Sequence, residues 1–433
     1  MTFFKNHFQK LIKNQLIAGS AILFAGSMLA SFGNYLYHLL MGRMLGPVDY
    51  GVLASLISLT YLFGIPIGTL SLVTVKYVSA LRGEKKFETI SYLYSWLNKK
   101  LVIFGLVGFL LLVITSPLIA SFLHFDSILP LLLLIASSLI AVYLSVNTAT
   151  IQGFLRFGWM SVLGIIQAIL KVGIAVLLVF IGLKVLGAVT SILFGSLVGL
   201  VLTRLLVRRL LSKKEKKEKI DIQEISKYAI PVFFSSLAFT SLYTSDIVLA
   251  RHFLSAQEAG FYAALAVLGK IIFFASGPII MVMFPMVSER HANGKKYANL
   301  FKLSFGLVLF ICLGVSVVYF LFPGLMVKIL FGSQYLPAAP YLVLFAIFLS
   351  LYSLASLLVN FYLSIKKVKI VILPVIAAVV QIILIVIFHQ NLSQIIWVSI
   401  SVLFLLLVSL LIYYLYSYGE SKKSFSFRRY SCL

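Results

Sequence analysis

The chain has 433 residues, of which 61% are hydrophobic and only 11% are charged, and its mean hydropathy is +1.09. A soluble domain carries about 25% charged residues, so a chain this apolar cannot cover a water-facing surface and must lie in a membrane. Cys312 and Cys432 stand far apart, which excludes a disulfide framework and a cysteine metal cluster.

Twelve runs of about 20 mostly apolar residues are long enough to cross a bilayer. They lie near residues 16–40, 51–75, 101–122, 128–150, 159–182, 185–206, 228–250, 260–287, 301–322, 340–363, 370–388 and 394–416. The last two are divided at the polar break His389, Gln390 and Asn391, because residues 370–419 contain no Asp, Glu, Lys or Arg. The first run is too long for the apolar core of a secretory signal, which favours an uncleaved anchor.

The basic residues set the orientation, since short cytoplasmic loops carry an excess of Lys and Arg. With the N-terminus inside, 30 Lys and Arg residues fall on the inside, and only Arg43, Lys184, Arg251 and Lys328 fall outside. We therefore expect both termini in the cytoplasm. The same asymmetry explains the net charge of +24 by membrane sorting and contact with anionic lipid, so no nucleic-acid partner is expected.

One long basic loop divides the chain into two halves of six spans each. We predict an N-lobe at residues 1–206, a basic cytoplasmic linker at 207–227, and a C-lobe at 228–433 that ends in a short basic cytoplasmic tail. The halves share residues in the same order: His38 and Arg43 with Asp246 and Arg251, Asp49, Gly51 and Ala54 with Glu258, Gly260 and Ala263, and Asn147 and Arg156 with Asn360 and Lys369. The nearly constant offset, 209 residues for Gly51 and Gly260, indicates an internal repeat.

An internal repeat in a membrane protein is typical of transporters. Duplicated bundles place a substrate site at their interface near the bilayer midplane, and transport rocks one bundle against the other. Six spans per copy keep both copies in one orientation, so we expect parallel repeats about an axis along the membrane normal.

Four segments resemble the signatures of polysaccharide-export flippases. They read GRMLGPVDYG at 42–51, GLKVLGA at 182–188, LGKIIFF at 268–274 and FPMVSE at 284–289. That family belongs to the superfamily of multidrug, oligosaccharidyl-lipid and polysaccharide exporters, which includes the lipid II flippase. The resemblance implies an all-α integral membrane fold with two six-helix lobes around a V-shaped central cavity, in the cytoplasmic membrane of a prokaryote.

Charged residues inside the spans are the candidate site, because each costs about 2.5–3.5 kcal/mol at a helix centre. Lys171, Asp246 and Lys270 interrupt spans 5, 7 and 8, and Arg43 and Arg251 stand at the outer ends of spans 1 and 7. We expect these five to line the substrate cavity, where their positive balance suits a pyrophosphate. The alternatives are arginines that reach the lipid headgroups and a structural ion pair between Asp246 and either lysine.

No enzyme signature accompanies these charges. The sequence contains no His/Cys metal spacing and no phosphate-binding Gly-Lys-Ser/Thr loop, and the longest outside loop, 323–339, carries only Lys328. We expect no catalytic residue, no metal site and no cofactor, while the choice of H⁺ or Na⁺ as a coupling ion stays open.

The predicted function is a flippase that moves polyprenyl-pyrophosphate-linked oligosaccharide repeat units across the membrane for surface polysaccharide synthesis, by alternating access. Two alternatives stay open: an ion-coupled exporter of small amphiphiles on the same fold, and a membrane glycan polymerase or acyltransferase. The expected partners are the lipid-linked substrate, membrane lipids, a polysaccharide polymerase and glycosyltransferases.

Overall fold

The structure is a computed structural model that describes residues 15–212, 214, 222–292 and 296–430. The described chain is helical throughout, which confirms the predicted all-α membrane class. It divides into two compact units, Met1–Phe233 and Phe234–Leu433, called here the N-unit and the C-unit. The basic residues of segments 1–14 and 215–221, which belong to the orientation argument, lie outside the described residues.

The helices follow the predicted spans closely. The N-unit contains α2 (Gln15–Gly83), α3 (Phe87–Phe122), α4 (Leu129–Gly153), α5 (Phe157–Leu178), the π-helical turn η1 (Val179–Leu183) and α6 (Lys184–Leu210). After α7 (Ile222–Leu242), which crosses the boundary, the C-unit contains α8 (Ser245–Phe253), α9 (Ala256–Ala292), α10 (Ala298–Leu321), α11 (Pro323–Leu330), η2 (Ser333–Tyr341), α12 (Leu342–Ser364), η3 (Val368–Val371), α13 (Ile372–Ile387) and α14 (Leu392–Tyr430).

The described residues contain twelve candidate crossings once two long helical stretches are divided. Among the described residues, ten candidate spans are found when the bent pair α7 and α8 counts as one. Two of the ten, Ala25–Gly83 and Phe157–Leu210, have 59 and 54 residues, about twice what one crossing needs. Each contains a glycine with positive φ, Gly46 (φ 76°, ψ 174°) or Gly182 (φ 93°), where the helix is interrupted.

The break in α2 depends on the sequence Gly-Pro. The φ/ψ of Gly46 lies in a region that is open essentially to glycine alone. Pro47 follows at the first position of the next helical segment, where its missing N–H costs nothing. The turn is held from α6, because the Nζ of Lys184 lies 3.5 Å from the carboxylate of Asp49.

Two sequence predictions need correction. The seventh span is broken: α7 and α8 meet at Tyr243 and Thr244 with a bend of 43°. The outside segment 323–339, predicted as a loop, is helical through α11 and η2. Apolar residues line this segment at helical spacing, and Pro323 starts α11 at a position that favours proline.

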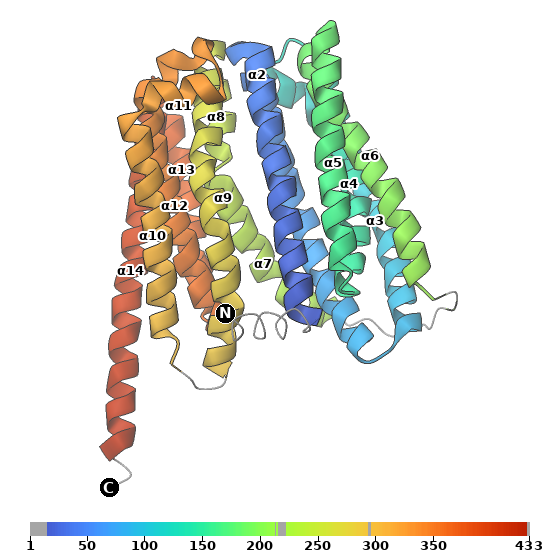
Figure 1. The fold of residues 1–433 in the computed structure, drawn as a ribbon, viewed down its shortest axis with the longest axis vertical. Coiled ribbons are helices and arrows are strands. Elements are labelled where there is room, and N and C mark those ends of the chain that lie inside the picture. The colour runs from blue at the N-terminus through green and yellow to red at the C-terminus, as the bar shows by residue number, and fades with distance from the viewer. Residues whose placement is uncertain (1–14, 213, 215–221, 293–295, 431–433) are drawn as a thin grey trace, which may run out of the picture. The chain divides into compact units, whose positions relative to one another are not determined.

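Small residues bring α2 against α5 in the N-unit, and Figure 1 shows these helices running side by side. A Cβ added at Gly33 would stand 2.8 Å from the Cβ of Ala168, and one at Gly26 would overlap Ser161. Such contacts between small residues drive helix association in a bilayer, where lipid tails already satisfy apolar side chains. Gly33 thus sets the close approach that places the neighbouring Asn34 and Tyr37 beside α5.

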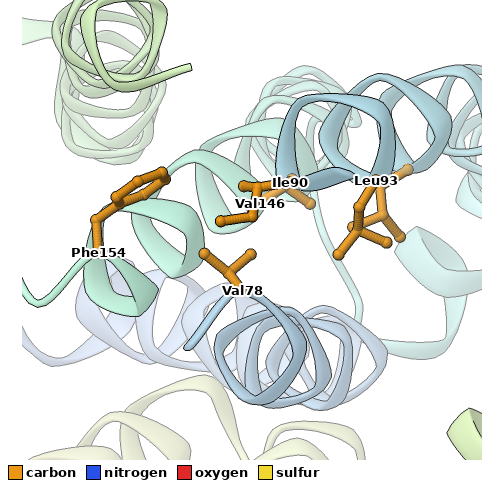
Figure 2. Packing of buried hydrophobic residues seen from close by; sticks show 6 residues of the cluster. Val78, Ile90, Leu93, Val146 and Phe154 are labelled. Carbon is orange, nitrogen blue, oxygen red and sulfur yellow. The ribbon is translucent and has the colours of Figure 1, made fainter. Parts of the chain in front are cut away.

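A separate apolar core joins α2, α3 and α4 at the end of the N-unit where the turns 84–86 and 154–156 lie. Val78, Ile90, Leu93 and Val146 meet there and Phe154 closes one side (Figure 2). Side-chain hydrogen bonds also connect the helices at this end. Tyr94 donates to Asn147 Oδ1 (2.8 Å), and Asn147 Nδ2 donates to Thr203 Oγ1 (3.1 Å). These side-chain contacts link α3, α4 and α6.

Helix α12 forms the centre of the C-unit. It packs on α9, α10 and α14, and 72% of an 18-residue apolar window in its candidate span Ser333–Ser364 is buried inside the protein. Gly269 allows the closest approach, since an added Cβ would lie 3.1 Å from Leu349 and 3.3 Å from the carbonyl oxygen of Phe345. This contact fixes the height of α9, and therefore of Lys270, against α12.

Candidate substrate-binding residues

Lys171 lies on α5 where α5 faces α2. Its ammonium donates a hydrogen bond to Asn34 Oδ1 and stands 4.4 Å from the centre of the Tyr37 ring. Tyr37 is fully buried, and its hydroxyl donates to the carbonyl oxygen of Ala188 on α6 (3.0 Å). The lysine is therefore held on one amide and one aromatic face, and its ammonium makes a cation–π contact with that face.

Arg43 lies further along α2, three residues before the Gly46 break, and its side chain is exposed. Nine residues separate it from Asn34, which corresponds to about 13 Å along a helix. Nine residues are also about two and a half helical turns, so Arg43 lies on the opposite side of α2 from the Asn34 that contacts Lys171.

Asp246 lies at the start of α8, directly after the break in the seventh span, and is fully buried. Its Oδ2 accepts a hydrogen bond from the hydroxyl of Tyr262 on α9 (2.8 Å). Close by in the chain, the carbonyl oxygen of Leu242 accepts from Gln381 Nε2 (3.3 Å), which also donates to Ser399 Oγ (2.9 Å). A buried polar cluster thus connects α7, α8, α9, α13 and α14.

Two acceptors of this cluster lack donors. Within the part of the chain that the structure describes, no donor satisfies the buried Oδ1 of Asp246 or the buried Oε1 of Gln381. An unsatisfied buried acceptor costs about 1–3 kcal/mol, so these oxygens are suited to hold a proton, a water molecule or a cation.

Lys270 lies on α9 and is half-buried. Its ammonium stands 5.1 Å from the centre of the Tyr243 ring, at the break between α7 and α8, and it interacts electrostatically with Asp246. The structure therefore brings Lys270 and Asp246, which are 24 positions apart, to the same part of the C-unit.

Arg251 differs from the other candidates because its side chain is only 6% exposed. It lies in the last turn of α8, where a cation is favoured by the helix dipole. Arg251 is therefore buried, whereas Arg43 is exposed.

Sequence reasoning missed the partners of the charges. The sequence could have marked Gln381 as a site residue, because it is a polar amide inside an otherwise apolar span. Tyr37 and Tyr243 carried no such signal, because the chain has 22 tyrosines and nothing in the sequence marks these two as partners of Lys171 and Lys270.

The comparisons agree on the class of fold. The chain is similar to a multidrug resistance MATE family transporter of the MOP superfamily in an inward-facing conformation (TM-score 0.75, 13% identity, 92% of this chain and 97% of the other covered). It is also similar to the lipid II flippase MurJ in an inward closed conformation (TM-score 0.67, 16% identity, 93% and 87% covered). No curated protein matches the sequence.

These features define a multi-pass membrane protein with the twelve-helix, two-lobe fold of that exporter superfamily. The family model described as "polysaccharide biosynthesis protein" matches residues 40–340, which is more than half of the chain. The protein belongs to this polysaccharide biosynthesis family, as the sequence motifs predicted.

Proposed function

We propose that this protein is a flippase that carries lipid-pyrophosphate-linked oligosaccharide repeat units from the inner to the outer leaflet of the cytoplasmic membrane. The main observation behind this proposal is the pair of intramembrane lysines, Lys171 and Lys270, each placed over a tyrosine ring in its own unit. A mid-span lysine must face protein or water, and two of them supply the positive charge that a pyrophosphate needs. Membership of the polysaccharide biosynthesis family supports a glycan as the attached group.

The headgroup would cross the membrane within the protein while the polyprenyl chain stays in lipid. Alternating access would then move only the polar part of the substrate across the bilayer. Glycosyltransferases would supply the lipid-linked unit on the inside, and a polymerase would consume it on the outside.

The direct test is the lipid fraction of cells that lack the protein. We expect a complete polyprenyl-pyrophosphate-linked repeat unit to accumulate in the inner leaflet, because synthesis continues while translocation stops. Re-expression of the protein should clear it. Accumulation of the repeat unit in the outer leaflet would instead indicate the polymerase alternative, and absence of any lipid-linked intermediate would contradict the flippase.

One observation favours the exporter of small amphiphiles as a second candidate. Asp246 is a buried carboxylate with an unsatisfied oxygen, and a lone intramembrane carboxylate often binds a coupling cation. Drug efflux from cells that carry the gene, without any change in surface glycan, would support this function over the first.

The proposed orientation can be tested with single cysteines in a chain freed of Cys312 and Cys432. A cysteine at Lys99 should resist impermeant thiol reagents added to intact cells, because the basic segments 76–100, 207–227 and 288–302 are expected inside. Ser333, exposed at the start of η2, is the matched outside position and should label readily. Labelling within 207–227 from outside would overturn the topology.

A further inference from the structure

An aromatic cluster lies beside Lys270 in the C-unit, with the centre of the Tyr243 ring 5.1 Å from the ammonium. Tyr243 and Phe273 are nearly parallel, with ring centres 6.0 Å apart and planes at 27°. Tyr352 of α12 meets both rings edge-on, at 5.4 Å from each. Phe274 extends the cluster, with its ring centre 5.4 Å from that of Phe273.

One ring of the cluster is buried, and the other three are partly or largely exposed. Tyr352 is 3% exposed, and its hydroxyl donates to the carbonyl oxygen of Phe239 at 3.3 Å, so this ring is fixed from below. Tyr243 and Phe273 are half-buried, and Phe274 is 46% exposed. The packed Tyr352 thus holds Tyr243 and Phe273, and Phe274 contacts Phe273. All three of these rings keep exposed surface.

The position of Lys270 bears on whether the exposed aromatic rings face lipid or water. Lys270, Phe273 and Phe274 stand at i, i+3 and i+4 of α9 and so share one face of the helix. A half-buried lysine in the middle of a span requires water or protein around its ammonium, because exposure to lipid tails is too costly. The exposed rings beside it share this helix face, so we place them on the side that a polar ligand reaches rather than against lipid tails.

The ligand must combine an apolar face with a negative charge close beside it. A pyranose ring presents its C–H groups as a flat apolar face with hydroxyls at the rim, and such a face packs on aromatic rings. Lys270 and Phe274 are four residues apart on α9, which is a rise of about 6 Å. This distance is comparable to the width of one sugar ring. A sugar on Phe274 and Tyr243 would hold its anomeric phosphate toward Lys270.

We propose that Tyr243, Phe273 and Phe274 form a saccharide-stacking subsite that binds the sugar ring attached directly to the pyrophosphate, with Lys270 as the phosphate contact. This inference rests on the proposed flippase function and names the part of the substrate that the C-unit recognises. A cationic amphiphile could stack on the same rings, but Lys270 repels its charge.

The test compares two substrates in proteoliposomes. One is the lipid-linked intermediate isolated from cells that lack the protein, and the other is the same polyprenyl pyrophosphate after removal of its glycan. Leaflet position is measured with an impermeant lectin for the first lipid and an impermeant phosphatase for the second. Phe274→Leu and Tyr243→Leu should raise the apparent KM for the glycan-bearing lipid about tenfold each, as expected for one lost aromatic contact.

Three further measurements make the result specific. Phe274→Leu should leave the sugar-free lipid unchanged, Phe274→Trp should retain the affinity, and Lys270→Gln should weaken both lipids. Phe310→Leu on α10 is the matched control, because Phe310 is 76% exposed and lies outside the cluster. If the wild-type protein flips the substrate and both leucine variants have an unchanged KM, the proposed subsite is wrong while the flippase function stands. Absence of flipping by the wild-type protein would overturn the proposed function together with it.

Discussion

Replacement of Lys171 or Lys270 by glutamine is expected to lower glycan export by about 10- to 100-fold while the protein remains in the membrane. A hydrogen bond to a charged group contributes about 1.5–3 kcal/mol, and each 1.4 kcal/mol corresponds to a factor of ten. Both ammonium groups are held in place, Lys171 by Asn34 and Tyr37 and Lys270 by Tyr243, so a neutral side chain of similar length loses the charge without losing the packing. Surface glycan and membrane-inserted protein would be quantified in the same cells.

Arginine at either position should retain more export than glutamine, because charge is the proposed role. Lys328→Gln is the matched control, since Lys328 is an exposed lysine in α11 and lies outside the spans. Normal glycan output from both glutamine variants would remove the anion-binding role of these lysines.

The spans were predictable because hydropathy alone selects them. Apolar runs of about 20 residues and the basic residues between them predicted the positions of the crossings, including the two pairs that join at Gly46 and Gly182. The break at Tyr243 and Thr244 was not predictable, since neither glycine nor proline marks it and the sequence 228–250 has the composition of one continuous helix. Tertiary contacts position this break, among them the bond from Gln381 to the Leu242 carbonyl oxygen.

The sequence predicted which charged residues form the candidate site, but it did not predict which residues they contact. Lys171, Asp246 and Lys270 stand out because ionisable residues are rare in spans. Their contacts join residues far apart in the chain: Lys171 meets Asn34 across 137 positions. Sequence also paired Asn147 with Asn360, yet Asn147 bonds Tyr94 and Thr203 while Asn360 Nδ2 donates to the Ser356 carbonyl oxygen one turn back in its own helix. The superposition of the two halves, with Gly51 over Gly260, stays a prediction.

One pair of repeat positions does share a bonding pattern. His38 in the N-unit bonds the hydroxyl of Tyr50 through Nδ1 (3.1 Å), and Asp246 in the C-unit bonds the hydroxyl of Tyr262 (2.8 Å). In both cases a titratable group of the first span in the half contacts a tyrosine of the second. The carboxylate in the C-unit is the more deeply buried of the two, which makes Asp246 the natural position for a coupling cation if the cycle requires one.

An inside-negative membrane potential is expected to drive flipping without any ion gradient. The proposed headgroup carries about two negative charges, and moving each outward gains about 2.3 kcal/mol per 100 mV. Two uncompensated charges gain about 4.6 kcal/mol, which shifts the leaflet distribution by a factor on the order of 10³. The empty protein, with the net positive charge of Lys171 and Lys270, then returns inward in the same field. Proteoliposomes with a potassium-diffusion potential and no pH or sodium gradient measure this directly.

Asp246→Asn separates this mechanism from cation coupling. The substitution keeps the shape of the side chain and its acceptor for the Tyr262 hydroxyl, while it removes the charge that a proton or sodium ion would need. Under the voltage mechanism the variant should still flip substrate in response to the imposed potential, because the substrate carries the moving charge. Flipping that ignores the potential, requires a proton or sodium gradient and stops in Asp246→Asn would refute it. In that case the unsatisfied Oδ1 of Asp246 would be the acceptor that the coupling cation occupies, and the two lysines would serve substrate binding alone.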